Sequence, residues 1–354
     1  MIKLVDRYIG GSVTIGVFSV LLLLLVLMGF FELLGELEDV KRDYTTVMAF
    51  KFVALGLPRY TYELFPVATL LGSLIGLGTL ANNSELIALR AAGVSVSRIL
   101  LAVLKAGLVL FVLVILIGEY LAPVTEQRAQ KMKMEALSDQ VTLKTRYGYW
   151  SRNGNTYINV RQILPNARLV DISIYDYDAE RRLQRVIHAD LADYEEGSWQ
   201  LQRVRLSEFS PDRVTTAKRQ HMQWSMLLEP TVLDVLAVKP HMLPAWDLWR
   251  YVAFLKQNGQ DSSNYEVAFW SKLLAPLVTL VMLFLSIPFV FGSLRSVGIG
   301  QRIFTGAIIG TLFYMLNRTF SYLAVVYGLS PLLASTLPTL LFFAAGFWFF
   351  LRVR

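Results

Sequence analysis

Long apolar stretches lie at both ends of the chain, and a more polar stretch separates them. A helix of about 20 apolar residues is long enough to cross the roughly 30 Å hydrocarbon core of a bilayer. Residues 1–125 hold three such stretches, the third ending at Pro123, and residues 263–354 hold three more. The pattern therefore predicts six transmembrane helices, at residues 12–34, 58–81, 99–122, 268–291, 303–325 and 332–351.

The second of these spans carries small residues at helical spacing, namely Gly72, Ser73, Gly76 and Gly78. Small residues let the backbones of two membrane helices approach closely. We therefore expect another helix to pack tightly against this part of the span.

Residues 126–262 have the pattern of an inserted β domain. Ile172 and Ile174 alternate with polar residues, and Asn153-Gly154-Asn155 is a turn signal. Short strands at about ten-residue spacing predict a sandwich or jelly roll. The expected fold is an α-helical polytopic membrane protein with an inserted all-β, jelly-roll-like domain, divided at residues 1–125, 126–262 and 263–354.

Charge is concentrated in the middle of the chain. Residues 126–250 hold 18 of the 34 Lys and Arg residues and 16 of the 27 Asp and Glu residues. Over the whole chain 55% of residues are hydrophobic and 17% are charged, whereas soluble domains are about 25% charged. This composition excludes an ordinary soluble enzyme and a disordered chain.

The positions of Lys and Arg also predict the orientation of the chain, because cytoplasmic loops are enriched in these residues. An even number of spans places both termini on one side, together with the loop at residues 82–98. That side holds Arg7, Arg90, Arg98 and Arg352. We therefore expect both termini and this loop in the cytoplasm, with the β domain on the opposite side of the membrane.

Motifs for catalysis and metal binding are sparse. The chain has no Cys, and its His residues, His188, His221 and His241, lack metal-ligand spacing. No P-loop and no G-x-S-x-G motif occurs. The net charge of +7 is spread along the chain without a basic run. It therefore indicates residues that orient the chain in a membrane, and we expect no nucleic-acid partner.

The loop at residues 82–98 predicts a short helix. Ser84 is a favoured residue type for an N-cap, and Glu85 in the first turn would interact favourably with the helix dipole. Gly93 is typical of a helix end. These signals place a helix at about residues 84–94.

The predicted loop helix is amphipathic, because Leu86, Leu89 and Arg90 fall on one face at spacings of three and four. Such a helix either lies in the membrane surface or docks onto a cytoplasmic partner. The residues alone leave both interpretations open.

Several short motifs, in a fixed order along the chain, resemble a known family. They are Asp6-Arg7-Tyr8-Ile9-Gly10, Ser84-Glu85-Leu86 through Gly93, Gly118-Glu119, Ala122-Pro123, Glu126-Gln127, Ile172-Ser173-Ile174-Tyr175, Trp270-Ser271-Lys272, Pro276-Leu277 and Phe291-Gly292-Ser293-Leu294-Arg295-Ser296-Val297. Over essentially its whole length the sequence resembles the LptF/LptG family of lipopolysaccharide-export permeases. The Asp-Arg-Tyr start and the Leu-Arg-Ser-Val stretch favour the LptG branch.

This resemblance implies a transmembrane permease subunit of an ABC exporter in the inner membrane of Gram-negative bacteria. Such a subunit extracts lipopolysaccharide and drives it toward a periplasmic bridge. The implied partners are an LptF paralogue, an LptB ATPase dimer and, through the complex, the LptC bridge component. ATP and Mg would be bound by the ATPase, so this chain is expected to be non-catalytic and to hold no cofactor.

The resemblance also implies that the loop helix is a coupling helix seated in a groove of the ATPase. The ATPase-coupling residues would be Glu85 and Arg90 through polar contacts, Leu86 and Leu89 through apolar contacts, and Gly93 at the helix end.

A cavity for a phosphorylated, multiply acylated lipid needs apolar walls with cations at its rim. We expect five substrate-binding rim cations, which a plainer interpretation takes as solvated charges at the membrane surface: Lys41, Arg42, Arg128, Lys131 and Lys133.

Two other classes of function stay open. One is a membrane-embedded scaffold for envelope assembly. The other is a lipid- or glycan-modifying membrane enzyme, for which Glu63 and Glu119 would be the acid/base pair.

Overall fold

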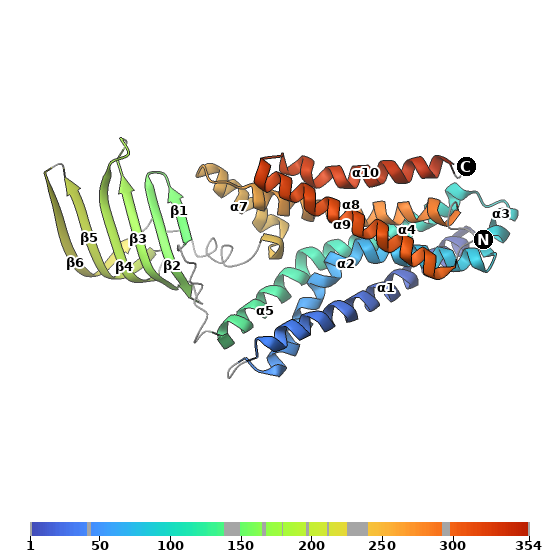
Figure 1. Cartoon of the computed structure of the whole chain (residues 1–354), viewed down its shortest axis with the longest axis horizontal. Coiled ribbons are helices and arrows are strands. Elements are labelled where there is room, and N and C mark those ends of the chain that lie inside the picture. Colours follow the sequence, from blue (N-terminus) through green and yellow to red (C-terminus); the bar gives the residue numbers. More distant parts are fainter. Residues whose placement is uncertain are drawn as a thin grey trace.

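A computed structural model describes residues 2–40, 44–137, 149–164, 168–178, 180–195, 198–210, 212–224, 240–291 and 298–352. Figure 1 shows an elongated molecule with a helical bundle at one end and a β sheet at the other. The N- and C-terminal ends lie at the end of the bundle far from the sheet, and the short helix α3 (Glu85–Ala91) lies there too. This arrangement is the one that an even number of spans requires.

Long helices build the bundle. Short helices α7 (Ala245–Gln257) and η3 (Pro240–Met242) lie on the side of the bundle nearer the sheet. The long helices are α1 (Ile2–Glu38), α2 (Thr46–Asn82), α4 (Val96–Leu116) continued by η1 (Ile117–Leu121) and α5 (Ala122–Leu137), α8 (Ser263–Phe291), α9 (Ile299–Tyr327) and α10 (Pro331–Arg352).

Five helical segments of the described chain are long and apolar enough to cross a membrane: Leu4–Glu38, Thr46–Asn82, Val96–Lys133, Ser263–Phe291 and Pro331–Arg352. They confirm the polytopic helical fold and five of the six expected spans. The remaining expected span, residues 303–325, lies within the 29-residue helix α9. Its role as a sixth span stays a prediction.

Small residues bring α1 and α2 into backbone contact, as the sequence predicts. A Cβ atom added to Gly72 would lie 2.3 Å from Cα of Val17, and one added to Gly76 would lie 2.5 Å from the carbonyl oxygen of Ser12. The Ser12 hydroxyl donates a hydrogen bond of 3.0 Å to the carbonyl of Gly76. The two helices are therefore packed too closely for any larger side chain at these positions.

The expectation that Pro123 ends the third span is wrong. A proline has no N–H and normally interrupts the helical hydrogen-bond ladder. Here the five-residue π-helical turn η1 directly precedes α5 and widens the helix before the proline. The helix therefore continues to Leu137, so the expected domain start at residue 126 falls inside a helix, and α7 also lies within the expected β segment.

Between α5 and η3 the described elements of the inserted domain are all β-strands, as predicted. Six antiparallel strands lie side by side in the order in which they occur in the chain. This sequential order is that of a meander, which is simpler than the jelly-roll connections we expected. The strands are β1 (Tyr149–Asn153), β2 (Thr156–Leu164), β3 (Arg168–Tyr177), β4 (Leu183–Glu195), β5 (Ser198–Ser210) and β6 (Arg213–Trp224).

One face of the sheet carries its apolar core. Ile174, Ile187 and Leu201 are at most 1% exposed there, beside the buried ring of Trp199. The polar residues that alternate with them lie on the other face, as the pleat of a strand requires.

Candidate functional site

The helix α3 joins α2 to α4 and follows the end of α2 after a two-residue turn, Asn83-Ser84. We expected Ser84 to cap it, and this is wrong: Ser84 has φ 62°, in the left-handed region, and its side chain makes no capping hydrogen bond. The reason is that a capping residue normally has an extended backbone, whereas the Ser84 backbone is left-handed, with its N–H donating to the carbonyl of Ala81 in the last turn of α2. The chain must therefore turn sharply at Ser84 to start α3.

The end of α3 agrees with the sequence prediction. Gly93 has φ 88°, and its N–H donates to the carbonyl of Arg90. The N–H of Val94 donates to the carbonyl of Leu89, which completes a Schellman motif. A left-handed residue is required here, and glycine adopts that conformation without strain.

Glu85 links α3 to the first helix. Its carboxylate accepts a hydrogen bond of 2.6 Å from the hydroxyl of Tyr8 on α1 and one of 3.3 Å from the side chain of Asn83. Displacement of α3 would therefore act on α1 directly.

The apolar side of α3 faces this chain's own bundle, which differs from the expected apolar contact with a partner. Leu86 is 3% exposed and lies in the main core, and Leu89 packs against the same core. The side chains that α3 presents outward include Arg90 and Ile87, the latter 47% exposed. Leu86 and Leu89 anchor the helix, and the coupling role of the α3 residues stays a prediction.

Two further polar contacts fasten the helices around α3. The guanidinium of Arg98 on α4 pairs with the carboxylate of Asp6 on α1 at 3.1 Å. The fully buried Arg302, at the start of α9, donates to the side chain of Asn82 at the end of α2. Gly78 leaves the space for it, because an added Cβ would lie 2.2 Å from a guanidinium nitrogen of Arg302.

Lys133, one of the expected rim cations, forms ion pairs within the chain. Its ammonium lies 2.7 Å from the carboxylate of Glu36, in the last turn of α1, and 2.9 Å from that of Asp39, just after α1. The Tyr44 hydroxyl donates to the same Glu36 at 2.7 Å. Burial, aided by this hydrogen bond, raises the pKa of Tyr44 well above its usual range, so the phenol stays a donor.

The other expected rim cations have different surroundings. Arg128 and Lys131 are exposed on α5, on the N-terminal side of Lys133. Lys41 and Arg42 lie outside the described residues. The substrate-binding role of all five stays a prediction.

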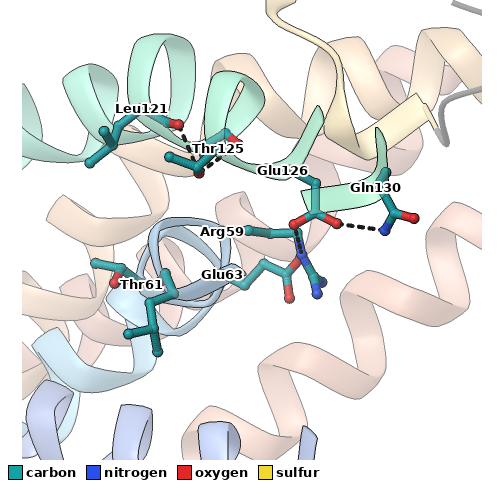
Figure 2. Close-up of polar contacts among 9 residues, drawn as sticks. Arg59, Thr61, Glu63, Leu121, Thr125, Glu126 and Gln130 are labelled. Atoms are coloured by element: carbon teal, nitrogen blue, oxygen red, sulfur yellow. Dashed lines mark hydrogen bonds and ion pairs between the residues drawn. The ribbon is translucent and has the colours of Figure 1, made fainter. Parts of the chain in front are cut away.

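A polar cluster between α2 and α5, centred on a buried carboxylate, was not predicted from the sequence (Figure 2). Glu126 is 2% exposed, and its carboxylate accepts from Arg59 at 3.1 Å and from Gln130 at 3.0 Å. Arg59 also pairs with Glu63 at 3.3 Å. The missed signal is the spacing of Glu126, Gln130 and Lys133 at i, i+4 and i+7, which places all three on the face of α5 toward α1 and α2.

The two acids considered for an enzyme make separate structural contacts. Glu63 pairs with Arg59 on its own helix. Glu119 accepts a hydrogen bond of 2.9 Å from the N–H of Ala245, at the start of α7, and lies 3.9 Å from the ammonium of Lys272. The carboxylates thus have different partners on different helices, and these contacts give no support to an acid/base pair.

These features define a polytopic α-helical membrane protein with a β domain inserted between two groups of spans. The family model "Lipopolysaccharide export system permease LptF/LptG" matches residues 7–352, and the chain belongs to this family. It is 36% identical over 357 residues to the lipopolysaccharide export system permease protein LptG of Haemophilus influenzae, with both chains covered completely. It is 35% identical over 351 residues to the LptG protein of Escherichia coli K12, with 98% of each chain covered. The resemblance to the LptG branch is thereby confirmed.

Proposed function

We propose that the chain is a permease subunit that moves lipopolysaccharide out of the inner membrane of a Gram-negative bacterium, driven by ATP hydrolysis in a separate ATPase. Family membership over residues 7–352 supports the transported substrate, since the relatives above are named as permeases of the lipopolysaccharide export system. In this proposal both termini and α3 are cytoplasmic and the β domain is periplasmic.

The observation that carries the coupling role is the contact of α3 with α1. The Tyr8–Glu85 hydrogen bond joins the loop helix to the first span, and the glycine contacts at Gly72 and Gly76 join that span to α2. A push on α3 therefore moves α1 and α2 as one unit. Closure of an LptB dimer below α3 would supply that push, with ATP and Mg bound by LptB.

An LptF paralogue would form the other half of the lipid cavity. The outward face of α1 supports this, because it carries exposed side chains such as Leu22, Val26 and Phe30, which need either lipid or another apolar helix as neighbour. In this proposal the LptC bridge component receives the lipid through the complex, and this chain contributes moving walls and no catalytic residue.

The experiment that tests coupling substitutes the outward side of α3. Ile87→Asp should abolish co-purification of LptB with this chain, because a carboxylate replaces an exposed apolar contact without touching the core. Val214→Asp, at a 57% exposed position on β6, is the matched control and should leave the complex intact. Undiminished LptB binding and lipid release in the Ile87→Asp complex would overturn the coupling role.

The experiment that tests the substrate role places photo-crosslinkers at Arg128 and Lys133 in the assembled complex. Crosslinks to lipopolysaccharide should form and should change in yield when ATP is added. Crosslinking that is absent at both positions would count against their place at the rim.

A further inference from the structure

The polar face of the β sheet carries a pocket that the proposed function does not use. It has a volume of about 880 Å³ and lies over β1 to β5. A pocket of this size is in the range that holds a small ligand. Its wall is built from two parallel rows of residues that cross the sheet.

The first row is continuous across the strands, because each residue is the cross-strand partner of the next. The side chains of such a row lie on one face of the sheet. The row consists of Trp150, Asn159, Ser173, His188 and Arg205 in the pocket, followed by Lys218 on β6 beyond it.

The second row runs parallel to the first and lies two residues away from it on each strand. At these positions the regular cross-strand pairing is interrupted between β2 and β3, between β3 and β4, and between β4 and β5. Two of its members, Asp171 and Arg203, have φ values of 57° and 53°. Residues other than glycine seldom adopt this left-handed conformation, which costs about 1 kcal/mol or more. Arg161 and Asp190 complete the row, and all four line the pocket.

The charged side chains of the second row form two ion pairs. Arg161 lies 3.5 Å from the carboxylate of Asp171, and Arg203 lies 3.1 Å from that of Asp190. His188 in the first row is 3.7 Å from each of these two carboxylates.

Arg205 gives the pocket its surplus of positive charge. It lines the pocket, is exposed, and forms no ion pair with the described part of the chain. The wall thus holds three arginines and two aspartates. A ligand with at least one negative group would complete this arrangement, since guanidinium groups bind carboxylates and phosphates strongly.

An aromatic platform lies at the β1 end of the pocket. The rings of Trp150 and Tyr175 are stacked, with centroids 5.7 Å apart and planes 22° from parallel. Trp150 is 51% exposed, so its ring is accessible. Exposed aromatic rings offer a flat apolar surface with polar groups at its margin, which matches the C–H face of a sugar ring.

We propose that this pocket binds an acidic sugar, namely the phosphorylated or carboxylated saccharide part of the lipid that the complex exports. The inference rests on the proposed function for the source of that sugar. The hydroxyls of the sugar would form hydrogen bonds with the two carboxylates and with Asn159 and Ser173. The sugar ring would stack on Trp150, and the acidic group would pair with Arg205. Acyl chains do not fit here, because the apolar core lies on the opposite face of the sheet.

A metal ion suits the pocket less well than a sugar. Each aspartate already has an arginine partner, and the described residues contain no group of three or more His, Asp and Glu side chains arranged to hold a metal. The mixed charges and the aromatic platform are typical of recognition of a polyhydroxylated, negatively charged molecule.

The test uses the full chain in its complex, reconstituted in nanodiscs, and measures binding of lipid-free, phosphorylated core oligosaccharide by calorimetry. We expect saturable binding that weakens about tenfold in Arg205→Gln and in Trp150→Ala, since each change removes one class of contact. Enzymatic removal of the phosphates should weaken binding to the wild type by a similar factor. Arg213→Gln, an exposed change at the far end of β6, is the matched control and should bind like the wild type.

Trp150→Phe should restore most of the affinity lost in Trp150→Ala, which separates loss of stacking from a folding defect. Absence of saturable binding, or equal affinity in wild type, Arg205→Gln and Trp150→Ala, would overturn the inference. Preferential binding of an acidic peptide over the oligosaccharide would overturn it too.

Lipid release from the same nanodiscs, measured in parallel, keeps the two proposals apart. Normal ATP-driven release without oligosaccharide binding would remove only the pocket inference. Oligosaccharide binding without any ATP-driven release would remove the export function and would identify a site for a free acidic sugar.

Discussion

Tyr8 on the first span donates a 2.6 Å hydrogen bond to Glu85 on the loop helix, across 77 residues of sequence. Both residues lie at the end of the bundle that holds the two chain termini. This contact predicts that Tyr8→Phe leaves ATPase docking intact and lowers coupling, because the outward face of α3 is unchanged while its link to α1 is lost. The ratio of lipid released to ATP hydrolysed should fall several-fold in the reconstituted complex. Tyr120→Phe, at a 70% exposed tyrosine, serves as control, and an unchanged ratio in Tyr8→Phe would refute the link.

The contact of α1 with α2 predicts a large effect of a single methyl group. In Gly72→Ala the new Cβ would overlap Cα of Val17, so the helices must separate. Overpacking of this kind costs about 1–3 kcal/mol or more, and thermal unfolding in detergent should show a clear loss of stability. Gly35→Ala, on α1, meets no atom within 4 Å and should be neutral or slightly stabilising, because alanine favours a helix more than glycine does. Equal melting temperatures for the two variants would contradict the packing.

The pairing of Lys133 with Glu36 predicts that the lysine contributes mainly to stability. In Lys133→Met the 7%-exposed Glu36 keeps its charge without its strongest partner. We expect a loss of roughly 2 kcal/mol, less than for a fully buried pair because Lys133 and Asp39 are partly exposed.

The double variant Lys133→Met with Glu36→Gln should recover part of that loss, since it removes the uncompensated charge. Thermal unfolding of the two single variants and the double variant measures this coupling. Strictly additive effects would show that the ion pair does not hold α1 to α5.

The end of α3 predicts a local effect of backbone strain. Gly93→Ala forces an alanine into φ 88°, at a cost of about 1 kcal/mol. The Schellman motif should open, and LptB should bind more weakly to the frayed helix. Gly298→Ala, at φ −67° with no atom within 4 Å, is the control. LptB binding should be measured by co-purification at increasing salt, and equal retention of LptB in both variants would argue against an intact α3 as the docking element.

Much of the fold follows from the sequence because its causes are local. Apolar length predicts the spans, Gly72 and Gly76 predict the close helix pair, and Gly93 predicts the end of α3. Ser84 and Pro123 misled the prediction, since Ser84 lies in the two-residue turn between α2 and α3, and Pro123 lies where η1 runs directly into α5. In both places the neighbouring turn decides the geometry. The N–H of Ser84 is taken by the end of α2, and a π-helical turn accommodates Pro123.

The candidate site was harder to predict because its partners are far apart in the chain. The sequence predicts Leu86 as an apolar contact for a partner, whereas in the structure the helical bundle buries it. Lys133 reads as a free cation until the end of α1 brings Glu36 to it. Pairings over about 100 residues depend on how the helices pack, which no single stretch of sequence encodes.

The sequential order of the six strands has a consequence for biogenesis. Every strand pairs with the strand made immediately before it, so the sheet is assembled from contacts of low contact order, and such contacts form quickly. On a chain synthesised from the N-terminus, β1 to β6 are complete before α8 leaves the ribosome. The sheet can therefore fold while the second group of spans has still to enter the bilayer.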